Sequence, residues 1–286
     1  MIIDNAGVAL HVAQDGDPDG PTVLVLHGIT SCTATWDWLV PHLAADYRVL
    51  RLDFRGHGQS GRAEGTYHFP SYLSDAVAVC EQVAGGPCVV LGHSLGGGTA
   101  AALAQKRRDL VRAIVLEDPA LAGSDQQRGE RGDGSLLAGF QLVRQSVPMM
   151  QQLGTTPEQL VGILAMTPAT TGGATLGDSL HPDAIAAIAV GLLQLDATVL
   201  DPVLEASMVA AFDANATIPV PTLVLAADGS SADAVVREPD IALLAQHSPH
   251  ADVRVVAGAG HLIHDSIAHR ATVLDAVLEF LAVNAG

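Results

Sequence analysis

An octapeptide in the first third of the chain, LGHSLGGG at residues 91–98, constrains the fold more than any other stretch. It places Ser94 among four glycines and separates two segments of different character. Residues 88–91 are apolar and rich in valine, which indicates a short buried strand, whereas the alanine-rich residues 99–106 favour a helix. Ser94 is therefore predicted to lie where a strand turns sharply into a helix. Gly92 and Gly96 would let the turn close around a strained serine backbone.

The same alternation of strand and helix runs through most of the chain. Strands are expected at 8–13, 22–26, 48–52, 88–91, 113–116, 221–226 and 252–258, and helices at 35–45, 72–84, 95–107, 241–246 and 267–283. This pattern predicts an α/β fold with a mostly parallel central sheet that is flanked by helices on both faces.

The strand pattern stops between residues 119 and 217. This region opens with a polar, glycine-rich loop at 122–135 and continues with helical patterns at 136–145, 157–165, 182–195 and 199–212. We therefore predict a core domain made of residues 1–118 and 218–286, with a helical cap at 119–217 inserted before the last two strands. Ligands of such sheets bind outside the carboxyl ends of the strands, so the cap would act as a lid.

Composition argues against several classes of protein. The net charge of −17 disfavours nucleic acid and anionic membrane surfaces as partners. No run of about 18 apolar residues is present, and the N-terminus lacks the basic and then apolar pattern of a signal peptide. Three cysteines without metal-ligand spacing favour reduced thiols in the cytoplasm. The 12 histidines are scattered and no phosphate-cradling motif occurs, so we expect neither a metal nor a cofactor.

A serine hydroxyl becomes a good nucleophile only beside a base that a third group orients. The segment GAGHLIH at 258–264 places His261 on a glycine-rich loop just after a strand, and we predict that His261 is the base. His264 is expected to be a structural neighbour. Backbone N–H groups of Leu95, at the start of the helix, and of Ile29, after an earlier strand, would form an oxyanion hole.

Five segments together resemble the α/β-hydrolases, specifically the serine hydrolases that carry a lid. They are LHGITS, DFRGHGQS, GHSLGG, PTLVLAAD and GAGHLIH. The resemblance covers almost the whole chain except the cap. It implies the α/β-hydrolase fold and a triad of serine, histidine and acid, and it implies that residues 53–60 are a structural loop.

The position of the acid stays open in the sequence. Asp228 directly follows a strand and is our first choice, because a residue at a strand end is well fixed. The usual family spacing to His261 instead favours Asp233. Relatives such as the haloalkane dehalogenases place the acid one strand earlier, where this chain has Glu117 and Asp118.

The sequence thus predicts a serine hydrolase that acts on a small ester or thioester through an acyl-serine intermediate. Three alternatives remain: an acyltransferase of secondary metabolism that moves an acyl group from a carrier protein or thioester to an amine or thiol, a carbon–carbon bond hydrolase, and a non-catalytic ligand-binding protein. The candidate residues for an acyl pocket are Trp36, Met149, Met150 and Met166. The sequence does not indicate the substrate or the oligomeric state.

Overall fold

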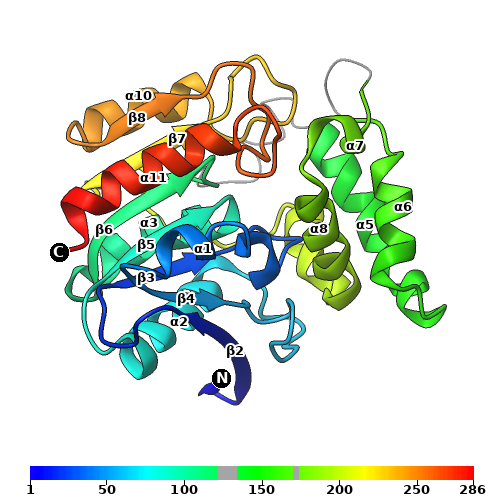
Figure 1. The fold of residues 1–286 in the computed structure, drawn as a ribbon, viewed down its shortest axis with the longest axis horizontal. Coiled ribbons are helices and arrows are strands. Elements are labelled where there is room, and N and C mark those ends of the chain that lie inside the picture. Colours follow the sequence, from blue (N-terminus) through cyan, green and yellow to red (C-terminus); the bar gives the residue numbers. More distant parts are fainter. Residues whose placement is uncertain (122–133, 170–173) are drawn as a thin grey trace.

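A computed structural model describes residues 1–121, 134–169 and 174–286, and it contains an eight-stranded sheet (Figure 1). The strand order is β1-β2-β4-β3-β5-β6-β7-β8, antiparallel at β1 and β2 and parallel from β4 onward. This sheet confirms the predicted α/β-hydrolase fold class. The strands are β1 (Ile2–Asn5), β2 (Val8–Asp15), β3 (Thr22–Leu26), β4 (Arg48–Leu52), β5 (Cys88–His93), β6 (Val111–Glu117), β7 (Thr222–Ala226) and β8 (Asp252–Val255).

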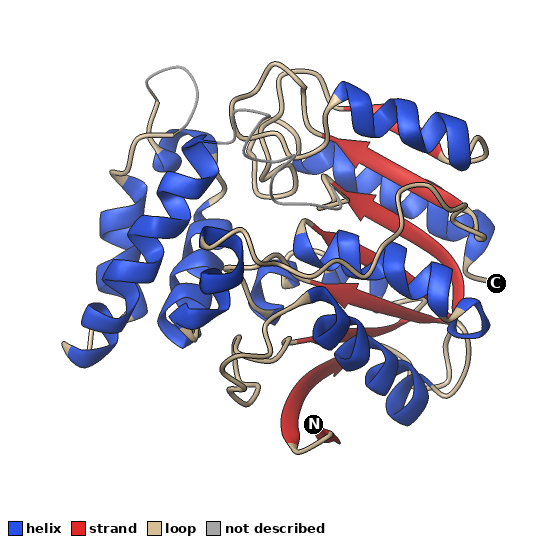
Figure 2. Cartoon of the chain, turned by 180° about the vertical axis from the view of Figure 1, so that it is seen from behind, coloured by secondary structure: helices blue, strands red, loops and turns tan. Residues whose placement is uncertain are grey.

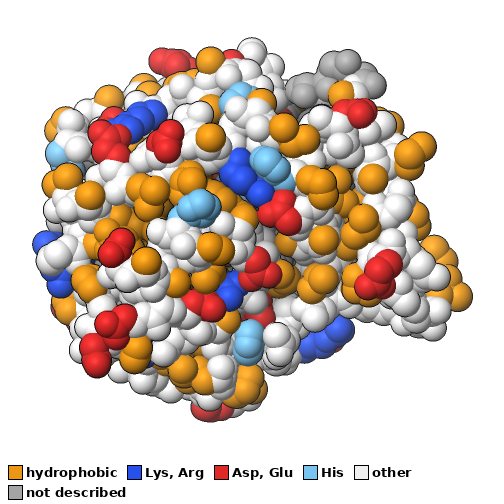
Figure 3. All heavy atoms as spheres, in the orientation of Figure 1, with side chains coloured by type: hydrophobic (Ala, Val, Ile, Leu, Met, Phe, Trp, Pro, Cys, Tyr) orange, Lys and Arg blue, Asp and Glu red, His pale blue; other side chains and the backbone are white. Residues whose placement is uncertain are grey.

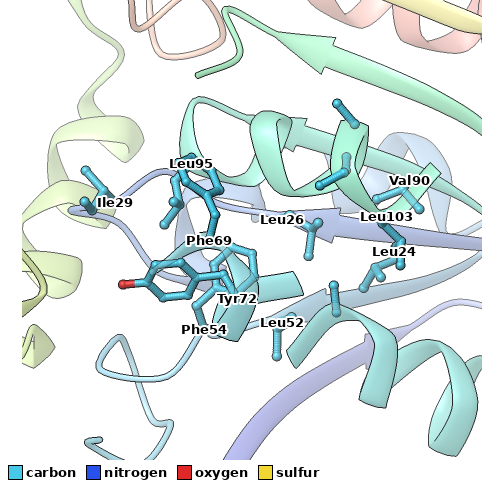
Figure 4. Close-up of a cluster of buried hydrophobic side chains, with 14 of the residues drawn as sticks. Leu24, Leu26, Ile29, Leu52, Phe54, Phe69, Tyr72, Val90, Leu95 and Leu103 are labelled. Carbon is cyan, nitrogen blue, oxygen red and sulfur yellow. The ribbon is translucent and has the colours of Figure 1, made fainter. Parts of the chain in front are cut away.

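Two hydrophobic cores lie on opposite faces of the sheet. Along β3, Leu24 and Leu26 pack into one core, whereas Val23 and Val25 pack into the other, as expected for side chains that alternate along a strand. Figure 4 shows part of the first core, and Figure 2 shows helices lying across that side of the sheet. The first core contains residues of α2 (Phe69–Val79), α3 (Leu95–Lys106) and α10 (Glu238–His247), and the second contains residues of η1 (Thr33–Trp36), α1 (Val40–Leu43) and α11 (Arg270–Asn284).

A group of helices between β6 and β7 lies beside the core, to the right in Figure 1. They are α5 (Gly134–Gln152), α6 (Pro157–Ala165), α7 (Leu176–Ser179), α8 (Pro182–Gln194), η4 (Ala197–Leu200) and α9 (Asp201–Leu204). Within the described residues, no single helix is long and apolar enough to cross a membrane, and only α8 taken with η4 and α9 reaches that test, as a pair bent by 100°.

Several element boundaries differ from the expectations. The helix expected at 199–212 is wrong, because the helical turns end at Leu204 and Ala206 has a φ of 52° that no helix continues through. The helix expected at 35–45 is split into η1 and α1. Helix α2 ends at Val79 and passes into the π-helical turn η2 (Cys80–Ala84). Most of the loop expected at 122–135 falls outside the described residues.

One strand was missed by the pattern. Strand β1 pairs with β2 through a tight turn at Ala6 and Gly7, both of which have positive φ angles of 54° and 86°. Both faces of β1 remain at least partly exposed, so its sequence lacks the apolar run of the buried strands.

Candidate active site

Ser94 occupies a strained turn between β5 and α3, with φ of 52° and ψ of −112°. The turn requires glycine on both sides. A Cβ atom at Gly92 would lie 2.3 Å from the carbonyl oxygen of Gly96, and one at Gly96 would lie 2.4 Å from the carbonyl oxygen of Leu26. Because backbone atoms make these contacts, a larger residue would have to move the strand or the helix. The turn expected from the sequence is present.

The hydroxyl of Ser94 meets His261. Its Oγ lies 3.0 Å from His261 Nε2, and His261 Nδ1 lies 2.6 Å from Oδ2 of Asp118. All three side chains are buried or nearly so. With the proton on Nδ1, the imidazole donates to the carboxylate and presents its free Nε2 lone pair to the serine hydroxyl, which is the arrangement a general base needs.

The expectation that Asp228 orients His261 is wrong. Its carboxylate instead accepts hydrogen bonds from the N–H of Gly258 at 2.8 Å and from the N–H and hydroxyl of Ser230. These hydrogen bonds lower the pKa of Asp228 to about 2, with the Gly258 N–H as the main cause. Asp228 therefore holds the start of the loop that carries His261 and does not contact the ring.

The two alternative acids also have other partners. Asp233 accepts a hydrogen bond from the Ser231 hydroxyl and lies beside Gly260. Glu117 binds His264 through its side chain. Glu117 also contributes its carbonyl oxygen, which accepts the N–H of Ser94 at 3.0 Å.

Backbone N–H groups hold the carboxylate of Asp118. Its oxygens accept from Ala227 at 3.3 Å, from Val235 at 2.9 Å and from Val236 at 3.0 Å, in addition to His261. These donors come from the loop after β7, the loop in which the sequence had suggested the acid itself. Strand β6 lies directly beside β5, so a carboxylate at the end of β6 is next to the serine turn. A positive φ of 36° at Asp118 aims the side chain toward His261.

The two expected oxyanion donors are the backbone N–H groups of Ile29, in the loop after β3, and of Leu95, the residue after Ser94. In the described part of the chain, no recorded hydrogen bond uses the N–H of Ile29 or of Leu95. The carbonyl oxygen of His27 accepts the N–H of Gly96 at 3.1 Å, which joins the loop after β3 to the start of α3. His57 Nε2 lies 2.6 Å from the Ile29 carbonyl oxygen and so fixes that peptide. Ile29 and Leu95 lie at the same end of the core in Figure 4.

The structure does not gather the four proposed pocket residues at Ser94. Trp36 is buried and stacks on the His264 ring at 4.5 Å. Met149 and Met166 are 57% and 77% exposed, and Figure 3 shows apolar side chains spread over the cap. Met150 packs against the edge of the first core. Among the described residues, no hydrogen bond or ring contact joins any of the four to Ser94, and their role in a pocket stays a prediction.

His93, the residue before the serine, supports the base loop. Its Nε2 lies 3.1 Å from the carbonyl oxygen of His261, so a neutral ring that carries its proton on Nε2 donates a hydrogen bond there. Burial, together with the neighbouring His261 and His264, holds the pKa of His93 well below its usual range. Among the described residues, no group of three or more His, Cys, Asp and Glu side chains is placed to hold a metal ion.

Comparisons with known proteins agree with this fold. Residues 21–146 match the family model described as the alpha/beta hydrolase fold. The chain is 34% identical over 116 residues to 2-(acetamidomethylene)succinate hydrolase of Mesorhizobium japonicum and 41% identical over 123 residues to lipase LipV of Mycobacterium tuberculosis. These alignments cover 41% and 43% of this chain, and the chain spans less than half of each relative, 41% and 44%.

A solved structure extends the likeness to the complete fold. The crystal structure of E-2-(acetamidomethylene)succinate hydrolase superposes with a TM-score of 0.73 at 22% identity, covering 99% of this chain and 98% of that one. The sheet order and the serine turn give this chain the α/β-hydrolase fold, and residues 21–146 match the model of that family.

Proposed function

We propose that the protein is a serine hydrolase that cleaves a small ester, thioester or amide through an acyl-enzyme intermediate. The observation that carries the proposal is the continuous hydrogen-bonded path from Ser94 Oγ through His261 to Asp118, with distances of 3.0 Å and 2.6 Å. A buried carboxylate, an oriented imidazole and a hydroxyl on a strained turn are the parts that acyl transfer requires.

In the first half of the reaction, Ser94 Oγ attacks the carbonyl carbon of the substrate while its proton passes to His261 Nε2. Asp118 stabilises the imidazolium that forms. The N–H groups of Ile29 and Leu95 donate to the oxygen that becomes negatively charged. The carbon–heteroatom bond then breaks, and His261 Nε2 returns the proton to the leaving group, which leaves an acyl-Ser94 ester.

In the second half, water takes the place of the leaving group. His261 accepts a proton from the water as its oxygen attacks the acyl-Ser94 carbonyl. The second tetrahedral intermediate collapses, the proton returns to Ser94 Oγ, and a carboxylic acid is released. An amine or thiol in place of water would make the same chain an acyltransferase.

The relatives support acyl cleavage without fixing a substrate. One is named for hydrolysis of 2-(acetamidomethylene)succinate and another as a lipase, so similar sequences serve unlike substrates. We therefore propose a small acyl compound as the substrate class.

An active-site probe tests the proposal without knowledge of the substrate. A fluorophosphonate should add one organophosphoryl group to Ser94, located by peptide mass analysis, and S94A should not be labelled. A panel of chromogenic esters and thioesters should then show turnover that the probe abolishes. Labelling at another residue, or no labelling of a folded protein, would contradict the proposal.

A further inference from the structure

A second buried pair, formed by a histidine and an acid, lies next to the triad in the chain. Glu117 and His264 are each 1% exposed at the side chain, and His264 Nδ1 lies 2.8 Å and 2.9 Å from the two carboxylate oxygens. The backbone N–H of His264 also donates to Glu117, at 2.9 Å. Glu117 precedes Asp118 in the chain, and His264 follows His261 by three residues. The pair therefore links the segment that carries the acid to the loop that carries the base.

The second ring nitrogen of His264 also faces oxygen atoms. Its Nε2 lies 3.2 Å from Thr35 Oγ1 and 3.3 Å from Asp265 Oδ1. Burial disfavours the charged ring, but Asp265 and Glu117 together outweigh that effect and raise the pKa of His264 to about 9. The ring also stacks on Trp36, whose aromatic face favours a cation.

The charged groups around His264 come from several elements. Glu117 belongs to β6, Asp265 follows His264 in the same loop, and Arg270 of α11 donates to the His264 carbonyl oxygen at 2.8 Å. Arg270 in turn binds Asp183 of the cap helix α8. The titratable ring of His93 lies beside both histidines, with its centroid 5.1 Å from His264 and 4.6 Å from His261.

We propose that Glu117 and His264 form a permanent buried ion pair that positions His261 against Asp118 and whose two charges balance each other at the base. The proposal rests on the proposed function, since it concerns the base of that triad. Neither residue touches the reacting atoms, so both are positioning residues. The hydrogen bonds fix the loop, and the two charges act on His261 with opposite sign.

Removal of the charge of Glu117 or of His264 should shift the pH dependence of the labelling rate. E117Q leaves a buried positive charge near His261 and should make the base harder to protonate, so the acid limb of the rate profile moves to lower pH. H264Q removes the positive charge and leaves the carboxylates of Glu117 and Asp265, so it should move that limb to higher pH. For a unit charge roughly 10 Å away in a protein interior, each displacement is on the order of one pH unit. The double variant E117Q/H264Q should return close to wild type.

The experiment measures the rate of fluorophosphonate labelling of Ser94 between pH 5 and pH 9 for the wild type, both single variants and the double variant. D75N is the matched control, because Asp75 forms a comparable buried ion pair with Arg55, at 2.6 Å, outside this cluster. D75N should lose stability but keep the wild-type midpoint. A gap of at least half a pH unit between E117Q and H264Q, with the lower midpoint in E117Q, supports the proposal, and coincident midpoints overturn it.

A measurement on the unaltered protein covers the case in which a single variant does not fold. In histidine side-chain nitrogen-15 spectra at pH 7.5, the ring of His264 should show two protonated nitrogens. A neutral ring would overturn the ion pair. Failure of the proposed function looks different, because wild-type Ser94 would then not be labelled at any pH while the spectrum of His264 would be unaffected.

Discussion

Asp118 Oδ2 lies 2.6 Å from His261 Nδ1, although Asp118 follows strand β6 and the loop after β7 holds two other aspartates. That later loop supplies the N–H groups of Val235 and Val236 to the Asp118 carboxylate. The segment after β6 therefore provides the acid, and the loop after β7 orients its carboxylate.

Substitution of the acid should separate these roles. D118N keeps the shape of the side chain but favours the wrong imidazole tautomer and no longer stabilises the imidazolium. We expect the rate of Ser94 labelling to fall about a thousandfold to ten-thousandfold. D228N is the control and should lose less than about tenfold, because Asp228 binds Gly258 and Ser230 and not the ring. If D228N is the more damaging change at equal thermal stability, the assignment of Asp118 fails.

Substitution of the base, His261, should reduce the labelling rate more than substitution of its neighbour His93. H261A removes the group that accepts the Ser94 proton, and we expect at least about a thousandfold loss of labelling rate. H93A removes a hydrogen bond to the His261 carbonyl oxygen without touching the serine proton, so a smaller loss is expected. Intact-mass spectrometry of samples quenched at a series of times measures both rates, and equal losses would show that the base has not been identified.

The roles of Ser94 and His261 could be predicted from the sequence, whereas the position of the acid could not. Ser94 lies between two glycines that a close backbone approach requires, and His261 follows Gly258, which has a positive φ of 74°. Such local requirements are visible in a sequence. Asp118 directly follows β6 and Asp228 lies two residues after β7, so the argument from strand ends applied to both. The choice depends on which strand lies beside β5, and strand order is a property of the whole sheet.

The helices between β6 and β7 and the residue Trp36 show the same contrast between local and long-range determinants. Helix α6 begins and ends where its residues predict, because Thr156 and Gln159 form a capping box at its start. The surroundings of Trp36 could not be predicted, because its stacking partner, His264, lies 228 residues away in sequence. Contacts of that separation are set by the packing of the complete fold.

The serine turn should tolerate no side chain at Gly96. An alanine Cβ would lie 2.4 Å from the Leu26 carbonyl oxygen, so G96A should destabilise the protein by about 3 kcal/mol or more, or prevent folding. Gly162 is the matched control, since it lies exposed within α6 and a Cβ there has nothing within 4 Å. G162A should raise stability by about 0.5–1 kcal/mol through helix propensity. Urea unfolding curves measure both, and a neutral G96A would contradict the close approach.

The buried ion pair should also give stability a distinctive pH dependence. The pKa of His264 is raised from its ordinary 6.5 to about 9 in the folded protein. A raised histidine pKa means that the folded state binds the proton more tightly, so this contribution is complete below about pH 6.5 and is lost as the pH rises through about 9. The free energy of unfolding of the wild type should therefore fall across that window, and H264Q should be less stable at pH 6 but show a flatter decline. D75N, which leaves His264 intact, should keep the wild-type slope from a lower starting value. Urea unfolding at half-unit steps from pH 6 to pH 9.5 gives the slopes, and parallel curves for wild type and H264Q would show that His264 is not charged in the folded protein.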